Sequence, residues 1–150
     1  MELVGRITEA QKEAMRARDA ARLSTVRMIL AAVKDREIAQ RTAGAALSEG
    51  DVLALLGKMV KQRQESAKVY AEGGRPELAE KERAEIAVIE AFLPRALDTA
   101  EVAAAIDTAI AEVGAASLKD MGKVMAVLKD RHTGQMDFGA AGALIKARLG

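Results

Sequence analysis

Residues 61–97 read KQRQESAKVYAEGGRPELAEKERAEIAVIEAFLPRAL, a pattern of two helices separated by a stop. Gly73-Gly74 ends the first helix, and Pro76 suits the first turn of the second because that turn leaves its N–H groups unpaired. Ile86 and Ile89 then repeat at helical spacing until Pro94 ends the segment. The stretch therefore predicts a helical pair followed by a domain boundary at Pro94.

The rest of the chain continues this helical pattern. Hydrophobic residues make up 50% of the 150 positions and aromatic residues only 2%, which is enough for a core built from strong helix formers. Helices are expected to begin at Glu2 (ending near Arg18), after Asp19, and at Ser48, Pro76, Asp98, Ser117 and Asp137. We expect an all-α fold in which residues 1–94 form an N-terminal bundle of about four helices. Residues 95–150 are expected to form a small three-helix C-terminal domain.

The composition excludes several classes of chemistry. Because the chain has no cysteine, disulfides, thiolate nucleophiles and cysteine-based zinc sites are absent, and the single histidine, His132, is expected in an exposed turn. We predict no cofactor and no metal. A net charge of +1 means that any nucleic-acid binding has to rely on a local basic patch. The N-terminal residues lack the apolar core of a signal peptide and no segment has transmembrane length, so we expect a cytoplasmic protein with no membrane contact.

The first helix of residues 61–97 turns polar on the side that should face the core. The apolar stripe of Leu56, Met59 and Val60 continues at three- and four-residue steps onto Arg63, Ser66, Ala67 and Tyr70, three of which are polar. Burying such groups without partners costs on the order of 1–3 kcal/mol for a hydroxyl alone. One interpretation is a polar network between helices, in which Glu82 and Glu85 of the next helix are the partners.

The other interpretation is a ligand site on the same helix. Tyr70 and Arg63 would stack on an unpaired base, while Lys61 and Arg75 would hold phosphates, as in recognition of single-stranded RNA. Glu82 and Glu85 also suggest a metal site, although paired glutamates on helices are far more often salt-bridge partners. The sequence leaves the network and the RNA site open.

A second candidate site lies between Ser117 and Lys129. A helix beginning near Leu118 points N–H groups at solvent, and Lys119 and Lys123 lie four residues apart at that positive end, where a phosphate can bind. Asp120 completes a capping pattern with Ser117, and Gly122 suggests close approach by another helix or backbone. The simpler interpretation is that Lys119, Lys123 and Lys129 are solvated charges on an exposed helix face.

Four groups of residues give the chain a resemblance to the YqeY family over nearly its whole length. They are RLSTVRMILAAVKDREI at 22–38; Lys61-Gln62-Arg63 with Ser66, Tyr70, Arg75 and Leu78; Glu82, Glu85, Leu93 and Pro94; and KDMGKVM at 119–125. The C-terminal module of this family is also the tail of the B subunit of the tRNA-dependent amidotransferase. The chain departs from the family where Gly134-Gln135-Met136-Asp137-Phe138 stands in place of Gly-Arg-Ala-Asp-Gly, so that a positive charge and a glycine are missing.

The resemblance implies an accessory protein that binds tRNA and presents it to an aminoacyl-tRNA-related enzyme. The activity associated with the family is that of a carbon–nitrogen ligase with glutamine as amido-N donor, but no catalytic constellation is visible in this chain. The alternative is a helical protein-interaction scaffold that binds no RNA. A weaker third hypothesis is a small enzyme that uses Arg63 and the glutamates.

Overall fold

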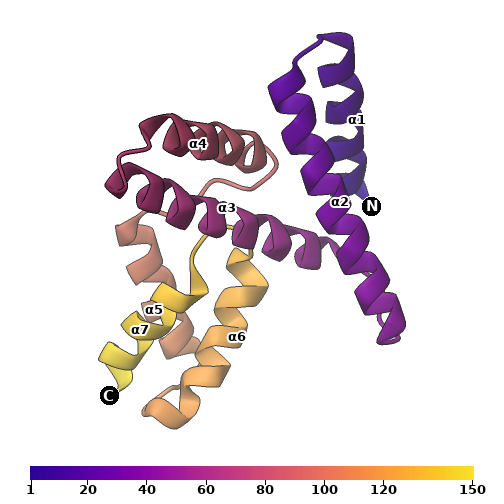
Figure 1. Cartoon of the computed structure of the whole chain (residues 1–150). Coiled ribbons are helices and arrows are strands. Elements are labelled where there is room, and N and C mark those ends of the chain that lie inside the picture. The colour runs from indigo at the N-terminus through magenta and orange to yellow at the C-terminus, as the bar shows by residue number, and fades with distance from the viewer. The chain divides into compact units, whose positions relative to one another are not determined.

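The computed structural model describes all residues, 1–150, as α-helices, one short 3-10 helix and connecting turns, without strands (Figure 1). The helices are α1 Glu2–Arg16, α2 Ala20–Thr42, α3 Glu49–Glu72, α4 Pro76–Glu90, α5 Thr99–Val113, η1 Leu118–Asp120, α6 Met121–His132 and α7 Phe138–Leu149. The all-α prediction is confirmed. The chain divides into two compact units, Met1–Pro94 and Arg95–Gly150, which are described separately below. None of the helices has the length and apolar character needed to cross a lipid bilayer.

The N-terminal unit, Met1–Pro94, is built around one core. Each of its four helices contributes a fully buried side chain to this core: Ile7 from α1, Ile29 from α2, Leu56 from α3 and Ile89 from α4. α1 and α2 form a hairpin, and α3 and α4 lie side by side (Figure 1). The core thus fixes α4 against α3, which positions the polar residues of α3.

Local hydrogen bonds explain where the helices of this unit begin. The Ser48 hydroxyl accepts from the Asp51 N–H and the Asp51 carboxylate accepts from the Ser48 N–H, which is the capping box expected for α3. The expected end of α1 near Arg18 was wrong by two residues. Arg18 adopts a left-handed conformation (φ 55°), and Asp19 caps α2 by accepting from the Arg22 N–H.

The C-terminal unit, Arg95–Gly150, packs three helices around Ile106 of α5, Leu128 of α6 and Ile145 of α7. Asp98 and Glu101 form the expected capping box at the start of α5. The close approach expected at Gly122 is wrong, because a Cβ there would meet nothing within 4 Å. Gly142 of α7 is a buried glycine that faces α6: a Cβ there would be in ordinary van der Waals contact, 3.4 Å from the methyl carbon of Met121 and 3.6 Å from that of Met125.

Gln135 joins the start of this unit to the turn between α6 and α7. Its side-chain amide donates to the Arg95 carbonyl (3.0 Å), and its own carbonyl accepts from the Leu97 N–H (2.8 Å). Its amide oxygen lies 3.2 Å from Nδ1 of His132. His132 is therefore the half-buried last residue of α6 and not the exposed turn residue that was expected.

Candidate functional site

Arg63 of α3 makes interhelix contacts inside the N-terminal unit. Its Nε donates to the carboxylate of Glu85 on α4 at 3.1 Å, and only 13% and 16% of the two side chains are exposed. A second nitrogen donates to the Met59 carbonyl (3.1 Å), and a third contacts the sulfur of Met28 on α2. Of the two glutamates considered, Glu85 is the partner, whereas Glu82 is half-buried on α4. Arg63 therefore links α2, α3 and α4, and its guanidinium is not available to stack on a ligand.

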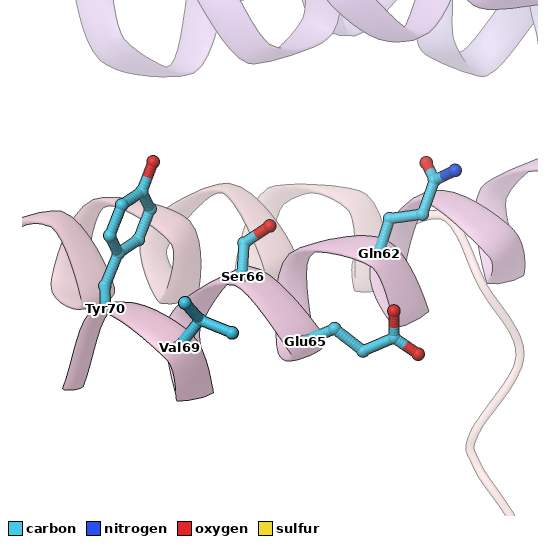
Figure 2. Close-up of a pocket in the computed structure, with 5 residues that line it drawn as sticks. All are labelled: Gln62, Glu65, Ser66, Val69 and Tyr70. Atoms are coloured by element: carbon cyan, nitrogen blue, oxygen red, sulfur yellow. The ribbon is translucent and has the colours of Figure 1, made fainter. Parts of the chain in front are cut away.

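Ser66 and Tyr70 belong to a different surface of α3. They line an open pocket, named here the α3 pocket, whose residues are Gln62, Glu65, Ser66, Val69 and Tyr70. Figure 2 shows Gln62, Ser66 and Tyr70 extending from the same side of the helix. The core-facing position is taken by Ala67, which is 5% exposed. The stripe that looked continuous in the sequence thus divides into a buried part at Arg63 and an accessible part at Ser66 and Tyr70.

The two remaining basic candidates of the N-terminal unit are exposed. Lys61 lies on the outer surface of α3. Arg75 is the residue before α4; its side-chain Nε donates to the Glu77 carboxylate at 2.8 Å, whereas its backbone N–H donates to the Tyr70 carbonyl of α3. The side-chain hydrogen bond holds the pKa of Glu77 below its ordinary value.

The segment around Lys119 and Lys123 is more irregular than expected. Leu118–Asp120 form the 3-10 helix η1, and α6 begins only at Met121. The Asp120 carboxylate turns back to accept from the N–H groups of Ala116 (3.0 Å) and Ser117 (3.4 Å). These bonds, with a smaller effect of the Lys123 charge, hold the pKa of Asp120 below its ordinary value. The Asp120 carboxylate therefore already occupies backbone N–H groups in front of η1. The positive charge available to a phosphate at this segment comes from the lysine side chains.

The cations of the C-terminal unit fall into two classes. Its three arginines pair with carboxylates: Arg95 with Glu101 at 2.6 Å, Arg131 with Glu112 at 2.5 Å and Arg148 with Asp107 at 2.7 Å. No carboxylate lies within ion-pair distance of its exposed lysines, although Lys123 acts on Asp120 at longer range. These lysines are Lys119, Lys123, Lys129 and Lys146. Since Lys129 lies six positions beyond Lys123, it is roughly 9 Å further along α6.

The structure does not bring the predicted residues together in one site. Arg63 and Glu85 pair inside the N-terminal unit, and Ser66 and Tyr70 share the α3 pocket. Lys61 and Arg75 are exposed elsewhere on that unit, and Lys119, Lys123 and Lys129 lie on the C-terminal unit. Sequence reasoning did not assign Gln62, Glu65 or Val69 of the pocket to a site, although their three- and four-residue spacing from Ser66 and Tyr70 was a usable signal. No cluster of three or more His, Asp or Glu side chains is placed to hold a metal ion.

A comparison with models of known protein families shows to which family the chain belongs. A family model described as Yqey-like protein matches residues 4–149. The chain belongs to the YqeY family. Its relatives include proteins named altered inheritance of mitochondria protein 41, mitochondrial. The one from Lachancea thermotolerans is 28% identical, over 99% of this chain and 80% of the relative.

Two further relatives of the same name match shorter parts of this YqeY-family chain. The Candida glabrata protein is 34% identical over 61% of this chain and 50% of its own length. The Meyerozyma guilliermondii protein is 39% identical over 55% of this chain and 41% of its own length. All three names place those proteins in mitochondria, which contradicts the cytoplasmic location expected from the sequence.

Proposed function

We propose that this YqeY-family protein is an accessory module that binds tRNA and presents it to an aminoacyl-tRNA-related enzyme. The observation that carries the proposal is the separation of cations in the C-terminal unit, where the arginines are paired with carboxylates and the lysines are not. A lysine that has no carboxylate partner exchanges only water and counterions when it meets a phosphate. Lys119, Lys123 and Lys129 supply that charge from η1 and α6.

The proposal assigns binding to this chain and chemistry to its partner. Amide transfer needs a nucleophile and a route for ammonia, whereas the chain has no cysteine and its one histidine is held by Gln135. The carbon–nitrogen ligase activity associated with the family resemblance would then reside in the enzyme that receives the tRNA. The network of Arg63 and Glu85 would have a structural role, which disfavours the hypothesis of a small enzyme built on those residues.

The first experiment measures binding of labelled total tRNA to the purified protein by fluorescence anisotropy over a series of salt concentrations. Because each phosphate contact releases counterions, log affinity should fall linearly with log salt. The double variant Lys119→Ala/Lys123→Ala should bind about tenfold more weakly at low salt, with a slope reduced by roughly 1.5.

A charge-matched control separates a local site from bulk charge. Lys12 of α1 and Lys81 of α4 are exposed lysines outside the proposed site, so Lys12→Ala/Lys81→Ala removes the same charge elsewhere. The control should retain the wild-type slope. Absence of binding at low salt, or equal losses in the two double variants, would refute the tRNA site.

Exposed apolar side chains favour a second candidate function, a protein-interaction scaffold. Val69 is 66% exposed on α3, and Leu118 and Leu144 of the C-terminal unit are 46% and 41% exposed. Apolar contacts are insensitive to salt, so a salt-tolerant complex with a protein partner and no affinity for tRNA would select this function.

A further inference from the structure

The α3 pocket, Gln62, Glu65, Ser66, Val69 and Tyr70, contains polar groups that the fold leaves unused. Hydroxyls inside helices commonly donate to the carbonyl four residues earlier, as those of Thr8, Thr25 and Thr42 do in this chain. Neither Ser66 nor Tyr70 uses its hydroxyl in a hydrogen bond to another group of the protein. Both extend to the same side of α3 as the amide of Gln62 (Figure 2). The pocket therefore presents an aromatic ring, two hydroxyls and an amide to a ligand.

The charges of the pocket restrict what that ligand can be. Glu65 is the only charged residue among those that line it, so the pocket repels a phosphate. Of the cations next to these residues in sequence, Arg63 points away to Glu85, and Lys61 and Lys68 do not line the pocket. A ligand of this pocket should be neutral and planar, with an apolar face for Tyr70 and Val69 and a polar edge for Ser66 and Gln62.

We propose that the α3 pocket binds an unpaired nucleobase of RNA. This inference rests on the proposed function and adds to it the part of the RNA that is recognised by the N-terminal unit. The base stacks on the ring of Tyr70, and its edge exchanges hydrogen bonds with the Ser66 hydroxyl and the Gln62 amide, each of which can donate and accept. Because the Gln62 amide and the Ser66 hydroxyl adapt to either kind of edge atom, the pocket accepts any base that is not paired.

The composition of the chain makes a direct test possible. Tyr70 is the only tyrosine, so protein labelled with 3-fluorotyrosine gives one ¹⁹F resonance, and that resonance reports on this pocket. We would titrate the full chain with tetraadenylate and, separately, with an abasic tetramer that carries the same phosphates. The resonance should shift with tetraadenylate and stay in place with the abasic tetramer. Equal shifts, or no shift with tetraadenylate up to millimolar concentration, would overturn the base site, and in the second case a protein segment would become the better occupant.

Two glutamines of α3 supply a matched pair of variants. In the double variant Gln62→Ala/Ser66→Ala, the tetraadenylate concentration that gives half of the maximal shift should rise at least fivefold, because the contacts to the edge of the base are removed. Gln64→Ala shortens an exposed glutamine that does not line the pocket and should leave the titration unchanged. An equal effect of both changes would contradict the assignment.

Salt dependence distinguishes failure of this inference from failure of the tRNA proposal. Tyr70→Leu should lower tRNA affinity at least fivefold at every salt concentration without changing the slope, because a stacked base releases no counterions. The lysine variants change the slope instead. A tRNA affinity that responds to Lys119 and Lys123 but not to Tyr70 would refute the base pocket alone. A shift with tetraadenylate in a protein that does not bind tRNA would refute the tRNA function alone.

Discussion

The Nε of Arg63 on α3 lies 3.1 Å from the Glu85 carboxylate on α4, and both side chains are largely buried. The ion pair joins α3 and α4 beside Met59, Ile86 and Ile89 of the hydrophobic core. It satisfies the guanidinium inside the bundle and leaves the neighbouring Ser66 and Tyr70 on an accessible surface. This single contact separates the structural part of the α3 polar stripe from the part that can meet a ligand.

Arg63→Ala should lower the free energy of unfolding of the N-terminal unit by about 2–4 kcal/mol, because it leaves the Glu85 charge buried without a partner. The fluorescence of Tyr70 during urea denaturation reports this unit alone, since the chain has no tryptophan and no other tyrosine. Arg83→Ala breaks the exposed pair with Glu80 and should cost less than about 1 kcal/mol. Equal losses of unfolding free energy in the two variants would mean that the Arg63–Glu85 pair contributes no more to stability than an exposed ion pair.

The C-terminal unit should become less stable as the pH is lowered, because Glu101 becomes protonated. The bond from Arg95, together with the Asp98 N–H, lowers the pKa of Glu101 from 4.5 to about 2. A carboxyl with a depressed pKa in the folded state stabilises it above the unfolded value of 4.5, and the contribution is lost as pH falls toward 2. Urea denaturation followed by circular dichroism across that range should show the loss.

Glu101→Gln should flatten this pH dependence, because the variant has no carboxyl to titrate at the start of α5. Glu90→Gln, which removes an exposed carboxylate at the end of α4, serves as the control and should follow the wild-type curve. If Glu101→Gln also follows that curve, the link between Arg95 and Glu101 does not contribute to stability.

Gln135→Arg should increase tRNA affinity if the C-terminal unit binds phosphate. The change adds a positive charge at the turn where the resemblance to the family implies an arginine, and that arginine can still donate to the Arg95 carbonyl that Gln135 now contacts. Anisotropy should give a salt slope steeper by about 0.7–0.9, the contribution of one added contact. Ala31→Arg adds the same charge at an exposed position of α2 outside both proposed contact sites and should leave the slope unchanged. An equal increase in the two variants would mean that net charge, and not the turn before α7, sets the affinity.

Alanine substitutions at two glycines of the C-terminal unit should change its stability in opposite directions. Gly114 ends α5 in a left-handed conformation (φ 65°), so Gly114→Ala should destabilise the unit by about 1 kcal/mol. A Cβ at Gly122 meets open space at the start of α6, so Gly122→Ala should stabilise it by up to about 1 kcal/mol. Thermal unfolding of the two variants measures both effects, and destabilisation by Gly122→Ala would indicate a contact at that glycine.

Features that depend on neighbouring residues were readable from the sequence. The capping boxes of Ser48 with Asp51 and of Asp98 with Glu101 need only a three-residue spacing, so the starts of α3 and α5 followed directly. The all-α class followed from composition and periodicity in the same way. The end of α1 did not, because the left-handed turn residue Arg18 is not a glycine and gives no signal.

Features that depend on helix register were not readable. Ser66 and Ala67 are adjacent in sequence but about 100° apart around α3, so steps of three and four residues could not decide which of them faces the core. The choice of Glu85 over Glu82 as the Arg63 partner depends in the same way on how α4 lies against α3. The exposure of Gly122 and the burial of Gly142 depend on which face of each helix meets its neighbour.

The packing of Met121 and Met125 over Gly142 makes the C-terminal unit sensitive to oxidants. Both thioether methyls rest on a glycine of α7, next to the buried side chains that hold the three helices together. Peroxide converts methionine to a polar, bulkier sulfoxide, which disrupts such apolar contacts until a reductase reverses it. With no cysteine in the chain, its methionines are the only readily oxidised sulfur, and oxidation of Met121 or Met125 is the event that would loosen this small helical interface.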